Sequence, residues 1–472
     1  MVILVKKDFR FFIAMTVAKT VTILLKLLRR NASHLPGWIA LKICPDLLGK
    51  IDKPEQIIAV TGTNGKTTVC NILIDILKGN GYDVLNNRLG SNIDAGITSS
   101  LILGSTVFGK AKRKVAVLEV DERSSKKVYP YIKPNYIVCT NLFRDSMKRN
   151  AHTEFIFDII NSSIPKESKL ILNADDLICS GLGANNEKVY FGIDKLDTDV
   201  KECINIINDI RTCPNCDSKL EYDYLRYHHI GKAHCSKCEF KSPKSNYFGT
   251  NIDFEKNTID VETSKGIEKY NLISNNIINI YNMLAAIAVL SEFGLTNEQL
   301  KEAFKKYKIV ESRYSEEEVD GKKIIKHLAK GQNPVACSRT FDYIKKEKGR
   351  KAVMLNLDDY YDARESSENM AWIYDADYEL LNSEDIVQII IGGVRVKDHY
   401  LRLLLAGVPK EKIFFEKSEI EAVKHLDIEN IDKVFILYDV FTTTTANLVR
   451  DEIVAKIKQK QMVEKMRDNV WK

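Results

Sequence analysis

The fold of this 472-residue chain is decided by the stretch IIAVTGTNGKTT, residues 57–68. Its first four residues are apolar and predict a buried strand, and the apolar residues beyond it recur at the spacing of a helix. Between them lies a turn with Gly62 and Gly65 that ends in Lys66 and Thr67. Such a turn is a cradle for phosphate, because free backbone N–H groups and the positive helix end attract anions. The stretch therefore predicts an ATP site in which Lys66 reaches the terminal phosphates and Thr67 holds Mg²⁺.

The composition is that of a globular protein with more than one domain. The length predicts roughly two to four domains of ordinary size. The chain is 44% hydrophobic and 28% charged, which is enough to bury real cores. Its net charge of +6 is spread along the sequence, so no nucleic-acid partner is expected. Four of the ten cysteines form two Cys-x-x-Cys pairs, which indicates a metal and a reducing cytoplasm rather than a disulfide framework.

The first part of the chain, residues 1–50, is expected to hold an amphipathic helix and a connector. Residues 11–28 are strongly apolar and have basic residues on both sides. Lys19 and Lys26 interrupt this run, which argues against a signal peptide or a membrane span. A helix packed on the protein's own surface and a basic helix resting on the inner membrane face both fit the pattern. Residues 31–56, with their prolines, are typical of a connector.

The central part, residues 51–312, alternates short apolar strands with helical patterns. The expected strands are residues 57–61, 115–120, 136–140, 169–173 and 188–192. This alternation predicts a mostly parallel sheet with helices on both faces, whose ligands bind at the carboxyl ends of the strands. Besides the phosphate loop, that edge should carry Glu119, Asp121, Asn141 and the turn 173–176.

The last part, residues 313–472, predicts a separate α/β domain. Its expected strands are residues 351–355, 386–391 and 433–437, and its end is a charged helix. Before it, residues 247–271 are typical of β-strands, and residues 277–293 predict an alanine-rich helix.

A metal ribbon interrupts the central domain at about residues 210–241. Cys213, Cys216, Cys235 and Cys238 form two knuckles with eighteen residues between the inner cysteines, a spacing that suits a structural, tetrahedral zinc site. Three histidines between the knuckles could also be ligands, although four cysteines already complete the shell. Aromatic and basic residues in the insert leave open a nucleic-acid contact. We rank this below the simpler interpretation of an insert in the ATPase domain that is held together by its metal.

These motifs together resemble the Mur ligase superfamily, and within it the MurT family. The loop has Val60 where the general nucleotide-loop pattern has glycine, which is the form of Mur ligases and folylpolyglutamate synthases. The most discriminating feature is the four-cysteine ribbon, which ordinary amino-acid-adding Mur ligases lack. The resemblance further covers NRLGSNI at 87–93, LEVDE at 118–122, TNLFRD at 140–145, LNADD at 172–176, YFGI at 190–193, NIYNMLAAIA at 279–288 and WIYDADYE at 372–379.

The resemblance implies a Mur-type ATPase and gives roles to matched positions. Glu119 would join Thr67 in the Mg²⁺ shell, since this ion prefers oxygen ligands. Asn282 would hydrogen-bond the adenine, and Arg313 would enter the nucleotide site from the linker to the last domain. The residues expected to bind the nucleotide are Thr63, Asn64, Gly65, Lys66, Thr67, Thr68, Glu119, Asn282 and Arg313.

The implied reaction is an ATP-dependent carbon–nitrogen ligation in peptidoglycan synthesis. ATP would phosphorylate the D-glutamate α-carboxylate of lipid II, with Lys66 stabilising charge, and ammonia would displace the phosphate. The ammonia would come from a GatD-like glutamine amidotransferase, because the chain shows no assignable glutaminase signature. Asp375, Asp377 and Asp362 are the candidates for the acid that orients or deprotonates ammonia. Cys337 could be proposed as a nucleophile, but an isolated cysteine is usually structural.

Three other hypotheses remain open from the sequence. A divergent paralogue would act on another carboxylate. A non-catalytic, zinc-stapled scaffold would bind ATP without acceptor-dependent hydrolysis. A nucleic-acid-binding module would show steep salt dependence, and the dispersed charge argues against it. The expected location is cytoplasmic, with contact to the inner face of the plasma membrane left open.

Overall fold

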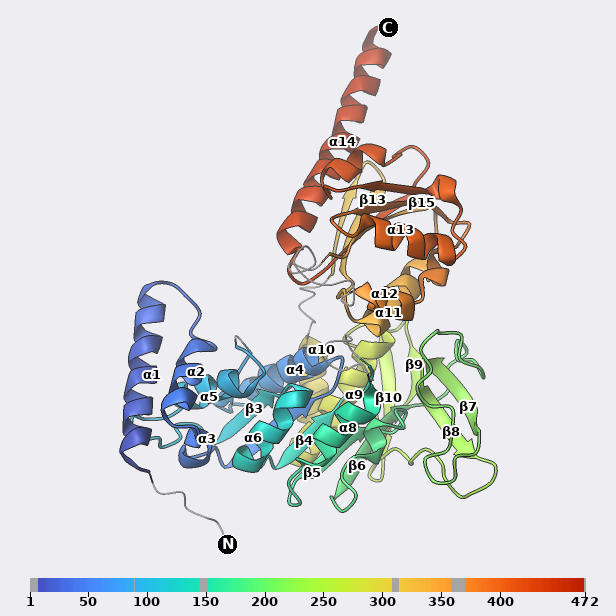
Figure 1. Ribbon diagram of the computed structural model, residues 1–472. Coiled ribbons are helices and arrows are strands. Elements are labelled where there is room, and N and C mark those ends of the chain that lie inside the picture. The colour runs from blue at the N-terminus through green and yellow to red at the C-terminus, as the bar shows by residue number, and fades with distance from the viewer. Residues whose placement is uncertain (1–6, 89, 145–151, 308–313, 359–369, 471–472) are drawn as a thin grey trace. The chain divides into compact units, whose positions relative to one another are not determined.

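The computed structural model describes residues 7–88, 90–144, 152–307, 314–358 and 370–470 (Figure 1). The chain forms two compact units. The first contains residues 1–143, 152–203 and 209–309, and the second contains 144–151, 204–208 and 310–472. Arg313 and Asp362 lie outside the described residues.

The first unit is built on a nine-stranded sheet in the order β11-β10-β9-β6-β5-β4-β1-β3-β2. Its strands are β1 (Gln56–Thr61), β2 (Val84–Asn86), β3 (Val115–Glu119), β4 (Tyr136–Cys139), β5 (Lys169–Asn173), β6 (Lys188–Ile193), β9 (Tyr247–Asp253), β10 (Thr258–Thr263) and β11 (Gly266–Asn271). All neighbours run parallel except β9 with β10 and β10 with β11, which are antiparallel. The predicted parallel-rich sheet is confirmed.

Helices cover both faces of this sheet. They are α1 (Phe9–Leu27), α2 (Leu35–Ile43), α3 (Leu47–Lys50), α4 (Lys66–Gly79), α5 (Asp94–Leu103), α6 (Ser125–Ile132), α8 (Thr153–Asn161), α9 (Ile277–Phe293) and α10 (Asn297–Lys306), with 3₁₀ turns η1 (Glu122–Ser124) and η2 (Cys179–Gly181). On one face, α5, α6 and α8 share a core with Ile57 and Ala59 of β1. Successive strand residues point to opposite faces, and α4 and α9, which contact each other, cover the second one.

The segment expected to be a connector, residues 31–56, instead contains α2 and α3. Pro36 lies in the first turn of α2, where a missing N–H costs no hydrogen bond. Gly37 is needed there because α5 approaches closely: an added Cβ would lie 2.7 Å from the backbone nitrogen of Ser99. The proline and glycine therefore start a packed helix rather than break the chain.

The insert forms an antiparallel hairpin of β7 (Leu220–Tyr227) and β8 (Ile230–Cys235) between β6 and β9. The hairpin lies within the predicted range of about 210–241. A small core of Leu177, Leu220 and Ala233 lies beside the cysteines.

The second unit has a six-stranded sheet in the order β12-β13-β17-β14-β15-β16. Its strands are β12 (Tyr314–Val319), β13 (Lys322–Leu328), β14 (Lys351–Asn356), β15 (Ile386–Gly392), β16 (Ile413–Glu416) and β17 (Lys433–Tyr438). Its helices are α11 (Pro334–Lys346), α12 (Trp372–Asp375), α13 (Val396–Leu405) and α14 (Thr443–Val470), with 3₁₀ turns η4 (Tyr378–Leu381), η5 (Lys410–Lys412) and η6 (Glu421–His425). Only β12 runs antiparallel to its neighbour, so the predicted α/β domain is confirmed.

No helix within the described ranges combines the length and the apolar character that a bilayer crossing needs.

Candidate functional site

The phosphate loop, residues 62–65, joins β1 to α4 at the carboxyl edge of the first sheet. Gly62 and Gly65 have φ angles of 122° and 90°, which side chains rarely adopt. A Cβ on Gly62 would lie 2.9 Å from the carbonyl oxygen of Asn141, and one on Gly65 would clash with Oδ1 of Asn282. Both glycines therefore allow close approach as well as the turn. The free N–H groups of the first turn of α4 follow directly, as anion binding requires.

The segment after β4 clamps this loop. The Asn141 side chain accepts from the Asn64 N–H at 3.0 Å and donates to the Asn64 carbonyl at 3.0 Å. The Thr63 hydroxyl donates to the carbonyl of Phe143 at 3.1 Å and accepts from its N–H at 2.9 Å. Thr63 and Asn64, predicted as nucleotide ligands, thus hold the shape of the loop. The sequence placed Asn141 at this edge but did not show its role as a clamp.

Lys66 opens α4 and has a buried carboxylate partner that the sequence reasoning missed. Its Nζ lies 2.8 Å from Oε1 of Glu122, and the two side chains are 12% and 5% exposed. Nζ also donates to the carbonyl of Gly62. Burial opposes its charge, but Glu122 and the nearby carboxylates of Glu119 and Asp121 outweigh it and raise the pKa of Lys66. Lys66 is therefore a positively charged group beside the phosphate loop, where it can bind an anion.

Glu119 ends β3, where its register partner on β1 is Val60, two residues before the loop. The Asn92 amide donates to its Oε1 at 3.0 Å, and the Asn87 side chain bonds both its N–H and its carbonyl at 2.9 Å. The motif at 87–93 thus orients this carboxylate. Thr67, in the first turn of α4, is half-buried. A hydroxyl and a carboxylate are ligands that Mg²⁺ prefers, so these side chains fit the ion.

Asn282 lies on α9 and is 2% exposed. Its side chain lies against Gly65, which brings it beside the loop. It bonds Asn279 at 3.4 Å. Thr68, like Thr67, is half-buried in the first turn of α4. The structure therefore brings together every predicted nucleotide residue except Arg313, which lies outside the described part of the chain.

The turn 173–176 was expected at the carboxyl edge of the strands, and its two aspartates are engaged there by other protein groups. Asp175 accepts from the Tyr281 hydroxyl at 2.7 Å and pairs with Lys232 at 2.9 Å. Asp176 accepts from the N–H of Leu142 at 2.7 Å and lies 3.3 Å from Nε2 of His229. Both carboxylates are fully buried. They join the ribbon hairpin to the nine-stranded sheet, because Lys232 and His229 belong to the insert.

The four cysteines gather as predicted. Their sulfur atoms all lie within 4.8 Å of one another. Sγ of Cys213 is 3.5 Å from that of Cys238, and Sγ of Cys216 is 3.5 Å from that of Cys235. Zinc–sulfur bonds of about 2.3 Å in a tetrahedron require sulfurs about 3.8 Å apart, so the set fits a closed zinc site.

Two backbone groups add to this fit. The N–H groups of Asn215 and Lys237 donate to the sulfur atoms of Cys213 and Cys235 at 3.4 Å each. Among the described residues, only the cysteines form such a cluster. Of the histidines, His228 and His229 are fully buried against Phe143, and His234 pairs with Asp223 at 3.0 Å.

The acids predicted in the second unit differ in environment. Asp375 ends α12, is 30% exposed and lies 3.5 Å from Arg144. Asp377 is buried and accepts from the N–H of Ile206 at 2.6 Å and from the Asn205 amide at 2.8 Å. Burial raises the pKa of Asp377. Asp377 therefore fastens segment 204–208, whereas Asp375 is accessible to a reactant.

A further polar group lies at the carboxyl edge of the second sheet. Asn356 ends β14 and is 1% exposed, yet neither its amide nitrogen nor its oxygen has a hydrogen-bond partner among the described residues. Asp358, two residues on, accepts from the N–H groups of Val394 and Arg395 after β15. Nothing in the sequence pointed to Asn356, whose apolar neighbours predict only a strand. Cys337 is fully buried and burial raises its pKa well above the usual value, so it is not an accessible nucleophile.

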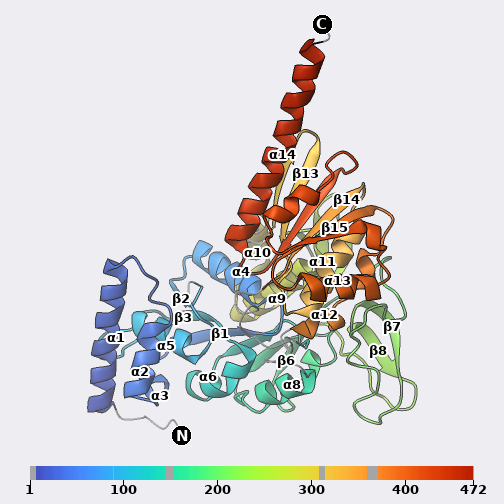
Figure 2. The same cartoon turned by 45° about the horizontal axis from the view of Figure 1, so that its top comes forward.

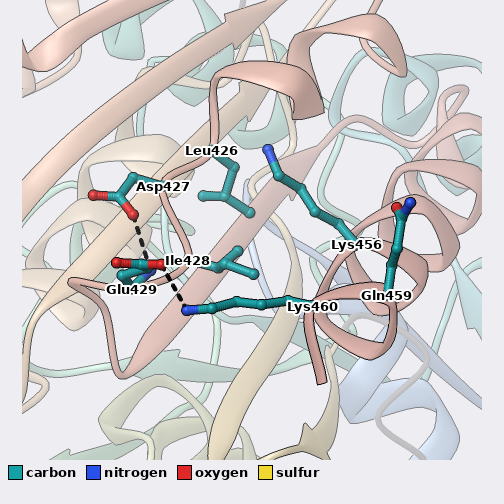
Figure 3. A pocket seen from close by; sticks show the side chains of 7 residues that line it. All are labelled: Leu426, Asp427, Ile428, Glu429, Lys456, Gln459 and Lys460. Carbon is teal, nitrogen blue, oxygen red and sulfur yellow. Dashed lines mark hydrogen bonds and ion pairs between the residues drawn. The ribbon is translucent and has the colours of Figure 1, made fainter. Parts of the chain in front are cut away.

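A shallow pocket of about 420 Å³ lies elsewhere in the second unit, between α14 and the segment after η6 (Figure 3). Lys460 pairs with Glu429 at 2.8 Å, and Lys456 donates to the carbonyls of Val423 and Lys424. Because these charges are satisfied within the protein, we assign the pocket no ligand. It is lined by Leu426, Asp427, Ile428, Glu429, Lys456, Gln459 and Lys460.

The architecture and the loop define the class of protein. Residues 60–290 match the profile of the Mur ligase middle domain, and residues 330–443 match that of the MurT ligase C-terminal domain. A pseudomurein peptide ligase type C from Methanothermus fervidus shares the fold, with a TM-score of 0.64 and 22% identity over 88% of this chain and 81% of that one. A MurF ligase from Thermotoga maritima, solved in complex with ADP, has a TM-score of 0.56 and 14% identity over 90% and 85%.

Relatives of known function place the chain within a particular family of Mur ligases. The chain is 35% identical to subunit MurT of the glutamine-hydrolysing lipid II isoglutaminyl synthase of Staphylococcus aureus, over 80% of this chain and 84% of that protein. It is 32% identical to the same subunit of Streptococcus pneumoniae, over 92% and 94%. The chain therefore belongs to the MurT family of Mur ligases. It is a MurT-like member of a family of ATP-dependent ligases.

Proposed function

We propose that this chain is the ATP-using subunit of an amidoligase that acts on lipid II. It activates the α-carboxylate of D-glutamate as an acyl phosphate and converts it into an amide with ammonia from a GatD-like glutaminase. The observation that carries this proposal is the similarity to MurT subunits along nearly the whole chain, including the C-terminal domain at 330–443. That domain distinguishes this family from ligases that share only the ATPase.

The first step is the transfer of a phosphoryl group from ATP to the acceptor at the phosphate loop. A carboxylate oxygen of the acceptor attacks the terminal phosphorus of ATP, and ADP leaves. Lys66 exchanges its bond to Glu122 for the phosphates, which carry more charge, while the N–H groups at the start of α4 bind the same oxygens. Thr67 and Glu119 would hold Mg²⁺, which screens charge on the transferred group.

The second step needs ammonia and a group that accepts its proton. The nitrogen attacks the acyl carbon, phosphate leaves, and one proton passes to a base. Of the predicted acids, Asp375 is partly exposed, so we propose it as this base. Asp377 is a positioning residue for segment 204–208. Asp362 remains a candidate outside the described residues.

The proposal extends to cofactors, domains and place of action. Zinc in the ribbon is structural, because four thiolates leave no open position. The domain division is residues 1–50, 51–312 and 313–472. The subunit forms a heterodimer with the glutaminase, binds no nucleic acid, and works in the cytoplasm, where lipid II presents its head group at the inner membrane face.

The test co-expresses this chain with its glutaminase and supplies lipid II, glutamine and Mg·ATP. We expect ADP release together with an acceptor whose mass falls by the exchange of OH for NH₂. Lys66→Ala should abolish both signals, whereas Lys78→Ala, at the exposed end of the same helix, should retain them. ADP release with an unchanged lipid II would favour a paralogue with another acceptor. ATP binding with no acceptor-dependent ADP would favour the non-catalytic scaffold.

A further inference from the structure

Helix α1 carries an apolar stripe on the side that faces away from the protein. Residues spaced by three or four positions lie on one face of a helix, and here apolar residues of that face are exposed towards both ends of α1. Phe9 is 78% exposed, Ile23 59%, Leu24 53% and Leu27 75%. The outer-stripe residues, which include the C-cap, are Phe9, Phe12, Ile13, Ile23, Leu24, Leu27 and Leu28. Exposed apolar patches of this size mark interaction sites.

The stripe is not needed to hold α1 in place. The opposite face of the helix is already buried, with Phe11, Ala14, Met15 and Ala18 fully inside the core. That face packs on α2 and α5 at the edge of the first unit (Figures 1 and 2). The exposed residues are therefore an addition to the fold rather than part of it.

Lys19 leaves the stripe uninterrupted. In the sequence this lysine divides the apolar run, but its side chain turns inward. Its Nζ donates to the carbonyls of Ile102 and Ser105 at 2.7 Å each, at the end of α5. Cations at a helix carboxyl end are favourable, so the charge is satisfied by the protein. Only Thr16 and Thr20 interrupt the exposed face between Ile13 and Ile23.

The apolar surface continues beyond α1. The ring of Phe108, 69% exposed, stands edge-on to that of Phe12, with centroids 6.4 Å apart. Lys7 bonds the carbonyl of Phe108 at 3.2 Å, which holds that loop against the start of α1. Two stretches of the unit distant in sequence therefore contribute to the same surface.

The charge around this surface is mainly positive, because the nearby acids Asp8 and Asp52 pair with Lys50 and Lys7. Between Phe9 and Pro45 the sequence has no acidic residue. Lys19 is turned inward, and the other basic residues of that segment are exposed: Arg10, Lys26, Arg29, Arg30 and Lys42. The Nζ of Lys42 lies 5.7 Å from the ring centre of Trp38, itself 48% exposed on α2. An apolar stripe bordered by arginine, lysine and a tryptophan is typical of a helix that lies in a bilayer interface.

We propose that the outer stripe of α1, with Phe108 and the basic residues around it, docks the first unit on a bilayer that contains anionic lipid. The helix lies in the plane of the interface: its apolar side chains enter the head-group boundary, and the basic side chains bind lipid phosphates. The excess of positive charge favours this occupant over a second copy, whose identical surface would repel it. Docking on the bilayer would bring the protein close to the lipid-linked substrate of the proposed function. The argument for docking rests on the residues of this surface alone.

The test uses the purified full chain and sedimentation with two kinds of vesicle, phosphatidylcholine alone and phosphatidylcholine with phosphatidylglycerol. We expect binding to the anionic vesicles at least tenfold tighter than to the neutral ones, and weaker binding as salt rises. The triple variant Ile23→Gln, Leu24→Gln, Leu27→Gln should lose it. The matched control is Ile267→Gln, Leu405→Gln, two positions 63% and 64% exposed elsewhere, and should bind like the wild type.

A second variant separates charge from apolar contact. Arg29→Gln, Arg30→Gln should remove most of the preference for anionic vesicles, and unchanged circular dichroism would show that both variants fold. Equal binding by the triple variant and the wild type, or no binding by the wild type, would overturn the proposal. Concentration-dependent dimers abolished by the same triple variant would assign the stripe to a second copy. Because no ATP, glutamine or acceptor is present, these results do not depend on the proposed reaction.

Discussion

Arg226 of β7 offers the sharpest test of how the four-cysteine ribbon is attached to the ATPase. Its side chain is 3% exposed and forms a fork with Asp199, at 2.7 Å through Nη2 and 3.2 Å through Nε. Nη1 lies 3.5 Å from Asp175 and donates to the hydroxyl of Tyr281. Burial disfavours the charge, but these partners raise the pKa of Arg226 above its usual value. We predict that Arg226→Met loosens the hairpin while the rest of the first unit stays folded.

The magnitude follows from what the substitution leaves behind. Asp175 and Asp199 are 0% and 1% exposed, and removing one partner of a buried ion pair costs about 3–5 kcal/mol. The lower end applies, because Asp175 keeps Lys232 at 2.9 Å and Asp199 keeps the Leu196 N–H at 2.9 Å. We expect a loss of about 3 kcal/mol in the free energy of opening the hairpin, which is roughly a hundredfold in the population of the open form.

Hydrogen exchange read by mass spectrometry measures this quantity directly. Peptides that cover β7 and β8 should exchange roughly a hundred times faster in Arg226→Met, and those that cover β14 and β17 should not change. Arg226→Lys keeps the charge without the fork, so it should show a smaller effect, about 1–2 kcal/mol. Lys219→Met, an exposed lysine of the same insert, is the matched control and should exchange like the wild type.

A double variant tests whether the loss comes from the carboxylate that Arg226→Met leaves unpaired. Arg226→Met combined with Asp199→Asn removes the unpaired charge, so it should recover part of the loss if the pair is the cause. Exchange in Arg226→Met that matches Lys219→Met would refute the reasoning, because the network would then contribute nothing to the attachment. Faster exchange in both units would show that the variant unfolds globally instead.

Three further predictions concern the loop and the second unit. Glu122→Gln should destabilise the nucleotide-free protein by about 1.5–3 kcal/mol, because it removes the buried partner of Lys66, and Mg·ATP should then raise the melting temperature by more than in the wild type. Asn141→Ala should weaken ATP binding in calorimetry by roughly tenfold, because both side-chain bonds to Asn64 are lost. Burial lowers the pKa of His399 to about 4. The folded state then binds fewer protons than the unfolded one, whose histidine pKa is about 6.5, so about 3 kcal/mol present above pH 6.5 is lost as pH falls towards 4. His399→Gln should flatten that decline in tryptophan-monitored unfolding.

The sequence predicted those elements whose pattern is local. The phosphate loop follows from a run of twelve residues, and α9 has the predicted bounds because its apolar residues continue over four turns without a breaker. The ribbon ligands follow from spacing alone, since a four-cysteine site needs few other residues.

What the sequence did not show depends on contacts between distant segments. Residue 37 must be a glycine because α5 approaches it within α2, and nothing near residue 37 carries that information. Glu122 and Asn141 act on the loop from 56 and 77 residues away. The aspartates of the turn 173–176 were placed at the correct edge of the sheet, but their partners come from the insert, whose position a spacing rule cannot give.

That turn connects the ribbon to the nucleotide site, which leads to a last prediction. Asp175 bonds Lys232 of the insert, while Asp176 accepts from the N–H of Leu142, next to the Asn141 clamp. The Asn173 amide also donates to the carbonyl of Thr140 at 3.2 Å. Because no ribbon cysteine belongs to the loop, zinc can act on ATP only indirectly, and these contacts provide one route.

Removal of zinc should therefore raise the dissociation constant for ATP, by roughly three- to tenfold if about 1 kcal/mol of clamp ordering is lost. Calorimetry on Cys213→Ser, and on the wild type after chelation and dialysis, measures the change, and returned zinc should reverse it in the wild type only. Arg226→Met should reproduce the weaker binding with zinc still present, because it cuts the same connection between ribbon and turn. An ATP affinity that ignores both zinc and Arg226 would mean that the ribbon is attached to the ATPase without supporting its nucleotide site.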